Sequence, residues 1–276
     1  AVGGSSSDSK TIEKFSLVSD GNSIDAGNLS DGRSDNPCGQ KSKTHGYCSG
    51  GYQYPSGGGG GLRNTIDKWS FTAGTDATDV GNLTATKSQL AGISSEDFGY
   101  TAGGNPSTNV IERFSFSSDG NSVDRADLTL ARQFLSGHNS STHGYAAGGG
   151  AGGVGNVIDT WLFSSNANAT DVADLTNSIA NQSNQSSITH GYASGGGGIA
   201  VINKWTFASD ANATDAGDLT VGRSNMCGVT STTHGYACGG DGWINVIDKF
   251  STAANANATD VGDLTTAYGS NAGSQY

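Results

Sequence analysis

The sequence predicts an all-β fold: a propeller of six blades, each with four antiparallel strands. Three markers recur along the chain and define the repeat. The first is a Gly-Gly pair after two small residues, at Gly3, Gly50, Gly103, Gly148, Gly195 and Gly239. The second is an Ile followed three residues later by an aromatic residue, at Phe15, Trp69, Phe114, Trp161, Trp205 and Phe250. The third is Asp-x-x-[Asp/Asn]-Leu-[Ser/Thr], with Leu29, Leu83, Leu128, Leu175, Leu219 and Leu264. A repeat of about 45 residues is typical of propellers and other repeat folds.

Each repeat divides into four segments of strand length, as residues 223–265 illustrate. A small polar segment comes first, and His-Gly-Tyr-x-x-Gly-Gly follows. The third segment is Val-Ile-x-Lys-aromatic, and the fourth is Ala-Thr-Asp-Val-Gly-Asp-Leu-Thr. Clusters of Gly, Asn, Ser and Asp separate the segments, and none has a helical period. Four short strands in each unit predict an antiparallel blade, and six such units predict a propeller.

The whole chain, 1–276, is predicted to be one domain, because the repeats leave no gap for a boundary. A Tyr precedes the Gly-Gly pair by three residues in five units, and joining Tyr276 to the first residue gives Gly3 the same spacing. We therefore expect about 268–276 and 1–30 to form the closing blade, with the two termini side by side. Such closure removes free sheet edges.

Composition narrows the classes of partner. The net charge is −11 and the basic residues are scattered singly, so a nucleic-acid partner is not expected. Membrane insertion is not expected either, since no apolar run approaches the roughly 20 residues that span a bilayer. The high content of Gly (44 residues) would favour disorder, but the periodic Ile, aromatic and Leu positions let neighbouring units bury a shared core.

Four histidines occupy one slot of the repeat, directly before Gly-Tyr: His45, His143, His190 and His234. Equivalent positions in different blades lie on a ring, too far apart to share a metal ion. We therefore expect these imidazoles, like the repeated aromatic residues, to be structural, and no metal site is predicted. A catalytic or metal-binding role is the alternative.

A second repeated slot is acidic, at Asp25, Asp79, Asp124, Asp171, Asp215 and Asp260. Carboxylates after turns rich in Asn and Gly could bind calcium, which takes several oxygen ligands from one loop. The spacing lacks the later bidentate Glu of an EF-hand. We favour the alternative, in which each Asp accepts backbone N–H bonds within its own turn, so no cofactor is predicted.

The four cysteines fall on neighbouring predicted strands of two blades. Cys38 pairs with Cys48 and Cys227 with Cys238, within the reach that a disulfide needs. The two intervals differ by one residue, so we expect one bulged hairpin or one missing bond. Disulfides would place the protein outside a reducing cytosol, and buried free thiols are the alternative.

Candidate binding residues lie in the irregular links between the second and third strands. They are Tyr52, Tyr54, Arg63 and Trp243. Exposed aromatic side chains on variable loops suit sugar rings or partner surfaces. We therefore predict contact with a host-surface glycan or protein. The alternative is that these loops fill space or pack against a neighbouring structural subunit.

The Gly-Gly pair, the aromatic residue and the Leu-x-x-x-Arg element resemble the kelch repeat, over all 276 residues. The set is also similar to kelch-like repeats in tail-fibre and structural proteins of marine bacteriophages. The chain departs from the kelch pattern where Lys87, Ile179 and Tyr268 replace the Arg found at three equivalent positions, Arg33, Arg132 and Arg223.

This resemblance implies a non-enzymatic structural or recognition module, extracellular or on a virion surface. Kelch-type propellers also include enzymes, with galactose-oxidase-like or sialic-acid-related chemistry, and protein-interaction adaptors. The enzyme alternative needs unlike residues that converge at one place, whereas the sequence offers repeated slots.

Overall fold

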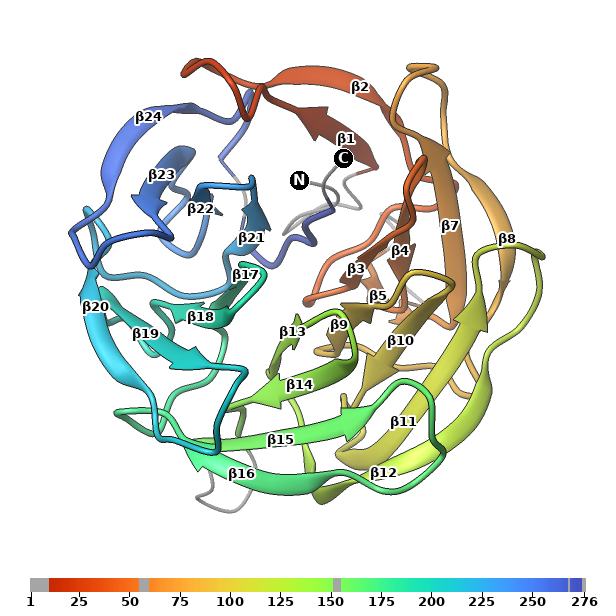
Figure 1. The fold of residues 1–276 in the computed structure, drawn as a ribbon. Helices are drawn as coiled ribbons and strands as arrows, with labels where there is room; N and C mark the ends of the chain where they lie inside the picture. The colour runs from red at the N-terminus through yellow and green to blue at the C-terminus, as the bar shows by residue number, and fades with distance from the viewer. Residues whose placement is uncertain (1–9, 55–59, 151–154, 268, 275–276) are drawn as a thin grey trace.

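The computed structural model describes residues 10–54, 60–150, 155–267 and 269–274. They form an all-β propeller, in which five four-stranded antiparallel blades surround a common axis (Figure 1). The described part of the chain contains no helix, and therefore none that could cross a membrane.

Each blade runs from a strand at the axis to a strand at the rim. The innermost strands are β3 (Cys38–Lys41), β9 (Ala91–Ser94), β13 (Ser136–Asn139), β17 (Ser183–Ser186) and β21 (Cys227–Thr230). The second strands are β4 (His45–Ser49), β10 (Phe98–Ala102), β14 (His143–Ala147), β18 (His190–Ser194) and β22 (His234–Cys238). The third strands are β7 (Thr65–Ser70), β11 (Thr108–Ser115), β15 (Val157–Leu162), β19 (Val201–Thr206) and β23 (Val246–Ser251). The outermost strands are β8 (Thr78–Asn82), β12 (Val123–Arg132), β16 (Thr170–Asp174), β20 (Thr214–Asp218) and β24 (Thr259–Asp263).

Two short sheets accompany the blades. β1 (Thr11–Lys14) pairs with β2 (Ile24–Asn28), with a register shift like those between the third and outermost strands of the blades. β5 (Tyr52–Gln53) pairs with β6 (Gly61–Leu62) in the long link between β4 and β7. This hairpin carries two of the predicted binding residues.

The repeated motif explains the packing within and between blades. In β14 and β15, the indole of Trp161 lies on Gly144, where an added Cβ would come 2.5 Å from the ring. The Tyr of the motif follows the Gly and therefore faces the other side of the sheet, toward the next blade. Tyr100 of one blade contacts Trp161 of the next, with ring centroids 6.4 Å apart. The repeated Ile111 is fully buried in the same cluster. The His-Gly-Tyr segment is therefore a strand because Gly admits the aromatic ring of its own blade while Tyr fills the gap to the neighbour.

At the rim, a repeated hydrogen bond joins each outermost strand to the turn before the next one. Asp127 N–H donates to Asn168 Oδ1 at 3.1 Å, and Asp263 N–H donates to Asn22 Oδ1 at 3.0 Å. Equivalent bonds link Asn28 to Asp76, Asn82 to Asn121, Asp174 to Asn212 and Asp218 to Asn257. The bond at Asn22 ties β24 to the turn that precedes β2.

The described residues form five four-stranded blades, not the predicted six. The inner strands predicted for the sixth fall on 268–276 and the first residues of the chain. Of these, 269–274 are described and form only a single bridge at Ala272. The remainder, including the expected junction of Tyr276 with Ala1, lies outside the described residues.

Candidate functional site

The innermost strands enclose a narrow channel along the axis. A Cβ added at Gly39 would lie 2.0 Å from the carbonyl oxygen of Gly273, and one at Gly273 would lie 2.2 Å from that of Gly228. The same close approach recurs from Gly92 to Gly39 and from Gly137 to Gly92. The backbones therefore approach closely around the axis, and this slot holds one side chain in the described blades, that of Asn184, whose Nδ2 donates to Gly137 O at 2.8 Å.

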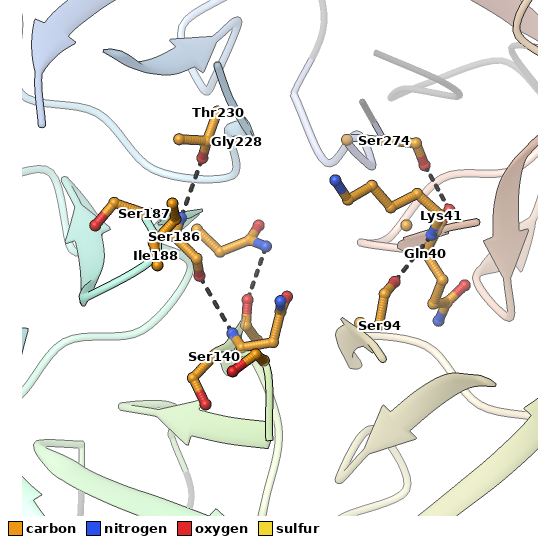
Figure 2. A pocket seen from close by; sticks show the side chains of 17 residues that line it. Gln40, Lys41, Ser94, Ser140, Ser186, Ser187, Ile188, Gly228, Thr230 and Ser274 are labelled. Carbon is orange, nitrogen blue, oxygen red and sulfur yellow. Dashed lines mark hydrogen bonds between the residues drawn. The ribbon is translucent and has the colours of Figure 1, made fainter. Parts of the chain in front are cut away.

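One end opens into a polar cavity of about 290 Å³, which we call the hydroxyl mouth. It is formed where the innermost strands end, and Figure 2 shows Lys41, Ser94 and Ser274 on one wall and Ser140, Ser186 and Thr230 on the facing wall. Hydroxyl groups join neighbouring strands here: Ser94 Oγ accepts from Lys41 N–H at 2.9 Å, and Thr230 Oγ1 accepts from Ser186 N–H at 3.0 Å.

The other end, which we call the amide mouth, holds about 50 Å³. Five residues in the left-handed backbone region line it, Asn36, Gln89, Phe134, Asn181 and Asn225, and Ser270 shares their conformation. From Gln89 to Ser270, each backbone N–H donates to the carbonyl of the preceding member, at 2.8 to 3.1 Å. Asn36 Nδ2 donates to Asn181 Oδ1 at 3.1 Å and to Asn225 Oδ1 at 2.9 Å. The Asn36 side chain thereby closes this end of the channel.

The amide mouth was missed from the sequence, although a signal existed. Asn36, Asn181 and Asn225 each stand two residues before an innermost strand. Asn tolerates the left-handed conformation better than most residues, so its recurrence at one offset marks a tight turn.

The predicted loop residues do not form one cluster. Tyr52 and Tyr54 lie on the β5–β6 hairpin with ring centroids 4.3 Å apart, and Tyr54 is 51% exposed. Arg63 is half-buried, and its backbone bridges Gly51 and Lys87. Trp243 is 62% exposed in the link between β22 and β23, in another blade. The structure thus pairs the two tyrosines and places Trp243 on a separate loop.

The repeated histidines are held within their own turns. At each of the four positions the preceding Thr hydroxyl lies 2.8 Å from Nδ1, as in the pair of Thr142 with His143. Burial lowers the pKa of His45 and of His190. The described residues include no group of three or more His, Cys, Asp or Glu side chains that could hold a metal ion.

The repeated aspartates also act locally. The carboxylates of Asp25, Asp79, Asp215 and Asp260 each accept the backbone N–H of the glycine two residues later, at 2.8 to 3.1 Å. This is the turn geometry that we favoured over calcium binding.

Four buried ion pairs were not foreseen. They are Arg33–Asp67, Lys87–Glu112, Arg132–Asp159 and Arg223–Asp248. Each carboxylate also accepts the backbone N–H of the Ser or Thr that follows the repeated Leu, as Asp159 does from Thr129. In the unit where Ile179 replaces the basic residue, Asn203 replaces the acid and still accepts from Thr176. The sequence signal for these ion pairs was that the basic and the acidic residue are both replaced by uncharged ones in the same unit.

One further buried group lies near the axis. His138 is 1% exposed on β13, with Nδ1 3.1 Å from Gln185 O and Nε2 2.8 Å from Ser136 Oγ. Its ring meets Trp205 edge-on. Because a carbonyl can only accept, Nδ1 carries the hydrogen and Nε2 accepts from the hydroxyl. Burial lowers the pKa of His138 to about 3, so the imidazole is neutral.

The predicted disulfides Cys38–Cys48 and Cys227–Cys238 are absent, and all four cysteines are free and buried. The β3–β4 register pairs Cys38 with Ser49, which puts Cys48 on the opposite face of the sheet. Neither hairpin is bulged. The shorter spacing between Cys38 and Cys48 therefore places these two cysteines on opposite faces of the sheet.

The second cysteine pair is different, because Cys227 and Cys238 are direct register partners. The hydrogen bond between their sulfurs, together with burial, raises the pKa of Cys238. Both remain thiols. The inference of an oxidising compartment therefore loses its structural basis.

Comparison with protein-family models and with curated proteins finds no match for the chain. The propeller is therefore established by the structure alone, and neither comparison supports the resemblance to kelch repeats or to phage tail fibres.

Proposed function

We propose that the chain is a non-enzymatic recognition module, in which a propeller presents aromatic loops to a surface glycan or protein. The observation that carries this proposal is the Tyr52–Tyr54 pair on its own short hairpin, with Tyr54 half exposed. Stacked or tilted aromatic rings at a loop tip give a rigid apolar face with polar hydroxyl groups, which suits the face of a sugar ring. Trp243, held exposed at a φ of 59°, offers a second such face.

The scaffold is proposed to have six units that close into a ring. The rim hydrogen bond occurs at six positions, and one of them joins β24 to the turn before β2. Thr265 N–H donates to Glu13 of β1 as Thr220 N–H donates to Asp248 of β23. Ser270 shares its left-handed conformation with the equivalent residue of each blade. These features support β1 and β2 as the outer half of a sixth blade.

The proposal also includes the resemblance to kelch repeats. Pairing of the Arg after the repeated Leu with an acid on the next third strand gives that kelch-like position a structural role. A place on a virion or cell surface, as a tail-fibre-like domain beside neighbouring structural subunits, rests on the repeat alone.

A second candidate is a protein-interaction adaptor inside the cell. The observation that favours it is the set of four free thiols, which fit a reducing compartment. The same loops would then contact a protein, so the class of ligand separates the two candidates.

The test compares the parent protein with a Tyr52→Ala/Tyr54→Ala variant and a Trp243→Ala variant on an array of immobilised oligosaccharides. Loss of the aromatic faces should weaken binding at least ten-fold, because stacking area is lost. Val18→Ala is the matched control, since Val18 is 99% exposed and lies on neither aromatic loop. Full binding by both loop variants, with folding intact, would remove the loops from the proposal. Absence of any glycan bound by the parent would favour the adaptor.

A further inference from the structure

Lys41 is an exception within a repeated slot. The equivalent residues on the other innermost strands, which are all uncharged, are Ser94, Asn139, Ser186 and Thr230. Figure 2 shows the Lys41 side chain extending from its wall into the space of the hydroxyl mouth. Since the repeated residues of this slot join the strands together, the one long cationic side chain is not required by the architecture.

The charge of Lys41 has no counterpart among the residues that the structure describes. Four other lysines, Lys43, Lys68, Lys87 and Lys249, each pair with a carboxylate. Lys41 takes part in none of the described ion pairs, and the described lining of the hydroxyl mouth contains no Asp or Glu. This is notable in a chain of net charge −11. Burial lowers the pKa of Lys41, as expected for an ammonium group that loses water and gains no anion.

The walls also supply hydrogen-bond donors. Ser94 Oγ accepts from Lys41 N–H, and Ser186 Oγ accepts from Asn139 N–H at 3.2 Å. An oxygen that accepts in this way keeps its own hydrogen to donate. Within the described residues no acceptor takes the hydrogen of either hydroxyl. The two hydroxyls lie on facing walls of the mouth into which Lys41 extends (Figure 2).

We infer that the hydroxyl mouth binds a small oxyanion, the carboxylate or phosphate group of a sugar-sized molecule, with Lys41 as the charge partner and Ser94 and Ser186 as donors. The cavity of about 290 Å³ lies at the small end of ligand sites, which suits one sugar-sized group. Charge-assisted bonds to the ammonium would compensate its burial. This site lies at the end of the channel opposite the amide mouth and does not depend on recognition by the aromatic loops.

The experiment titrates the purified protein with glucuronate, glucose 6-phosphate and glucose at low ionic strength, with binding followed by ligand-observed NMR. The parent should bind at least one of the two anions saturably and glucose at least ten-fold more weakly. Binding of glucuronate alone would identify a carboxylate ligand, and binding of glucose 6-phosphate alone a phosphate ligand. Equal binding of glucose, or no binding of either anion, would overturn the inference.

Two variants locate the site. Lys41→Gln should weaken binding of the anion at least ten-fold, whereas Lys41→Arg should retain most of it. Lys43→Gln is the matched control: it removes the same charge two residues away, but Lys43 is exposed and pairs with Glu96. An equal loss in Lys41→Gln and Lys43→Gln would show a diffuse charge effect and would refute the site. If Lys41→Gln does not fold, the affinities of the parent protein for the two anions and for glucose still test the inference.

Discussion

Arg132 and Asp159 are both fully buried and form an ion pair. Arg132 Nη2 donates to Asp159 Oδ2 at 2.6 Å, while its Nη1 donates to two backbone carbonyls. A buried charge without a partner costs far more than a buried apolar group. The Ile179–Asn203 unit shows that the fold accepts a neutral pair in the same place.

Arg132→Ile should therefore lower the free energy of unfolding by about 3–5 kcal/mol, because Asp159 is left buried and unpaired. The double variant Arg132→Ile/Asp159→Asn copies the natural neutral unit and should recover most of that loss. Urea unfolding of the three proteins measures both effects. A double variant as unstable as the single one would show that the charge pair itself, and not its imbalance, holds these blades together.

His138 gives a prediction for pH. Its pKa is about 3 in the folded protein, against roughly 6.5 when unfolded, so the unfolded state binds the extra proton between these values. The stability from this residue is complete above about pH 6.5 and is lost as the pH falls toward 3. Between pH 7 and 4.5 the loss should be roughly 2 to 3 kcal/mol.

His138→Gln provides the comparison, because Gln40 and Gln185 fill the same slot in other blades. Each of them likewise contacts the side chain two residues earlier and a backbone carbonyl of the next blade. The variant should unfold with a shallower dependence on pH across that range, as followed by urea unfolding at several pH values. If the free energy of unfolding depended on pH identically in the two proteins, a neutral, buried imidazole at this position would be contradicted.

At the scale of the element, the second and third strands of each blade form one packing unit. The repeated Gly and aromatic residue lie against each other within the blade, and Tyr contacts the next blade. The sequence pattern predicted these strands and their order, because each slot has a single residue type that the local geometry accepts. It did not predict which ring lies on which glycine, since that depends on the register between strands.

Trp161→Ala should lower the free energy of unfolding by about 3–5 kcal/mol, because it empties a buried site between two blades. Leu162→Ala is the matched control, since Leu162 is the next residue on β15 and is 44% exposed. It should change the stability by less than about 0.5 kcal/mol. Thermal and urea unfolding report both values, and a similar small loss in the two variants would contradict the packing role of the aromatic slot.

At the scale of the whole molecule, β1 and the turn before β2 contact the last four-stranded blade and the segment that follows it. Thr265 bonds to Glu13 of β1 through both its N–H and its hydroxyl, and Thr220 bonds to Asp248 of β23 in the same way. If the ring is closed, these two contacts are equivalent despite the distance of Thr265 from Glu13 along the chain.

Thr265→Val and Thr220→Val should then cost the same, about 1.5–3 kcal/mol each, because each removes a hydroxyl donor from a buried carboxylate. The free energy of unfolding in urea is the readout. A loss confined to Thr220→Val would mean that β1 and β2 detach without consequence, and the six-unit ring would have to be abandoned.

The sequence by itself determined the all-β class, and the four strands and their order in the five described blades, because a residue pattern repeated in register fixes local structure wherever it recurs. Only the tertiary structure decided which face Cys48 occupies, that Arg132 meets Asp159, and that Lys41 points into the hydroxyl mouth. Each of these depends on strand register or on contacts between units that are distant in the chain. A one-residue change in spacing reverses the face of a strand, and no single repeat contains that information.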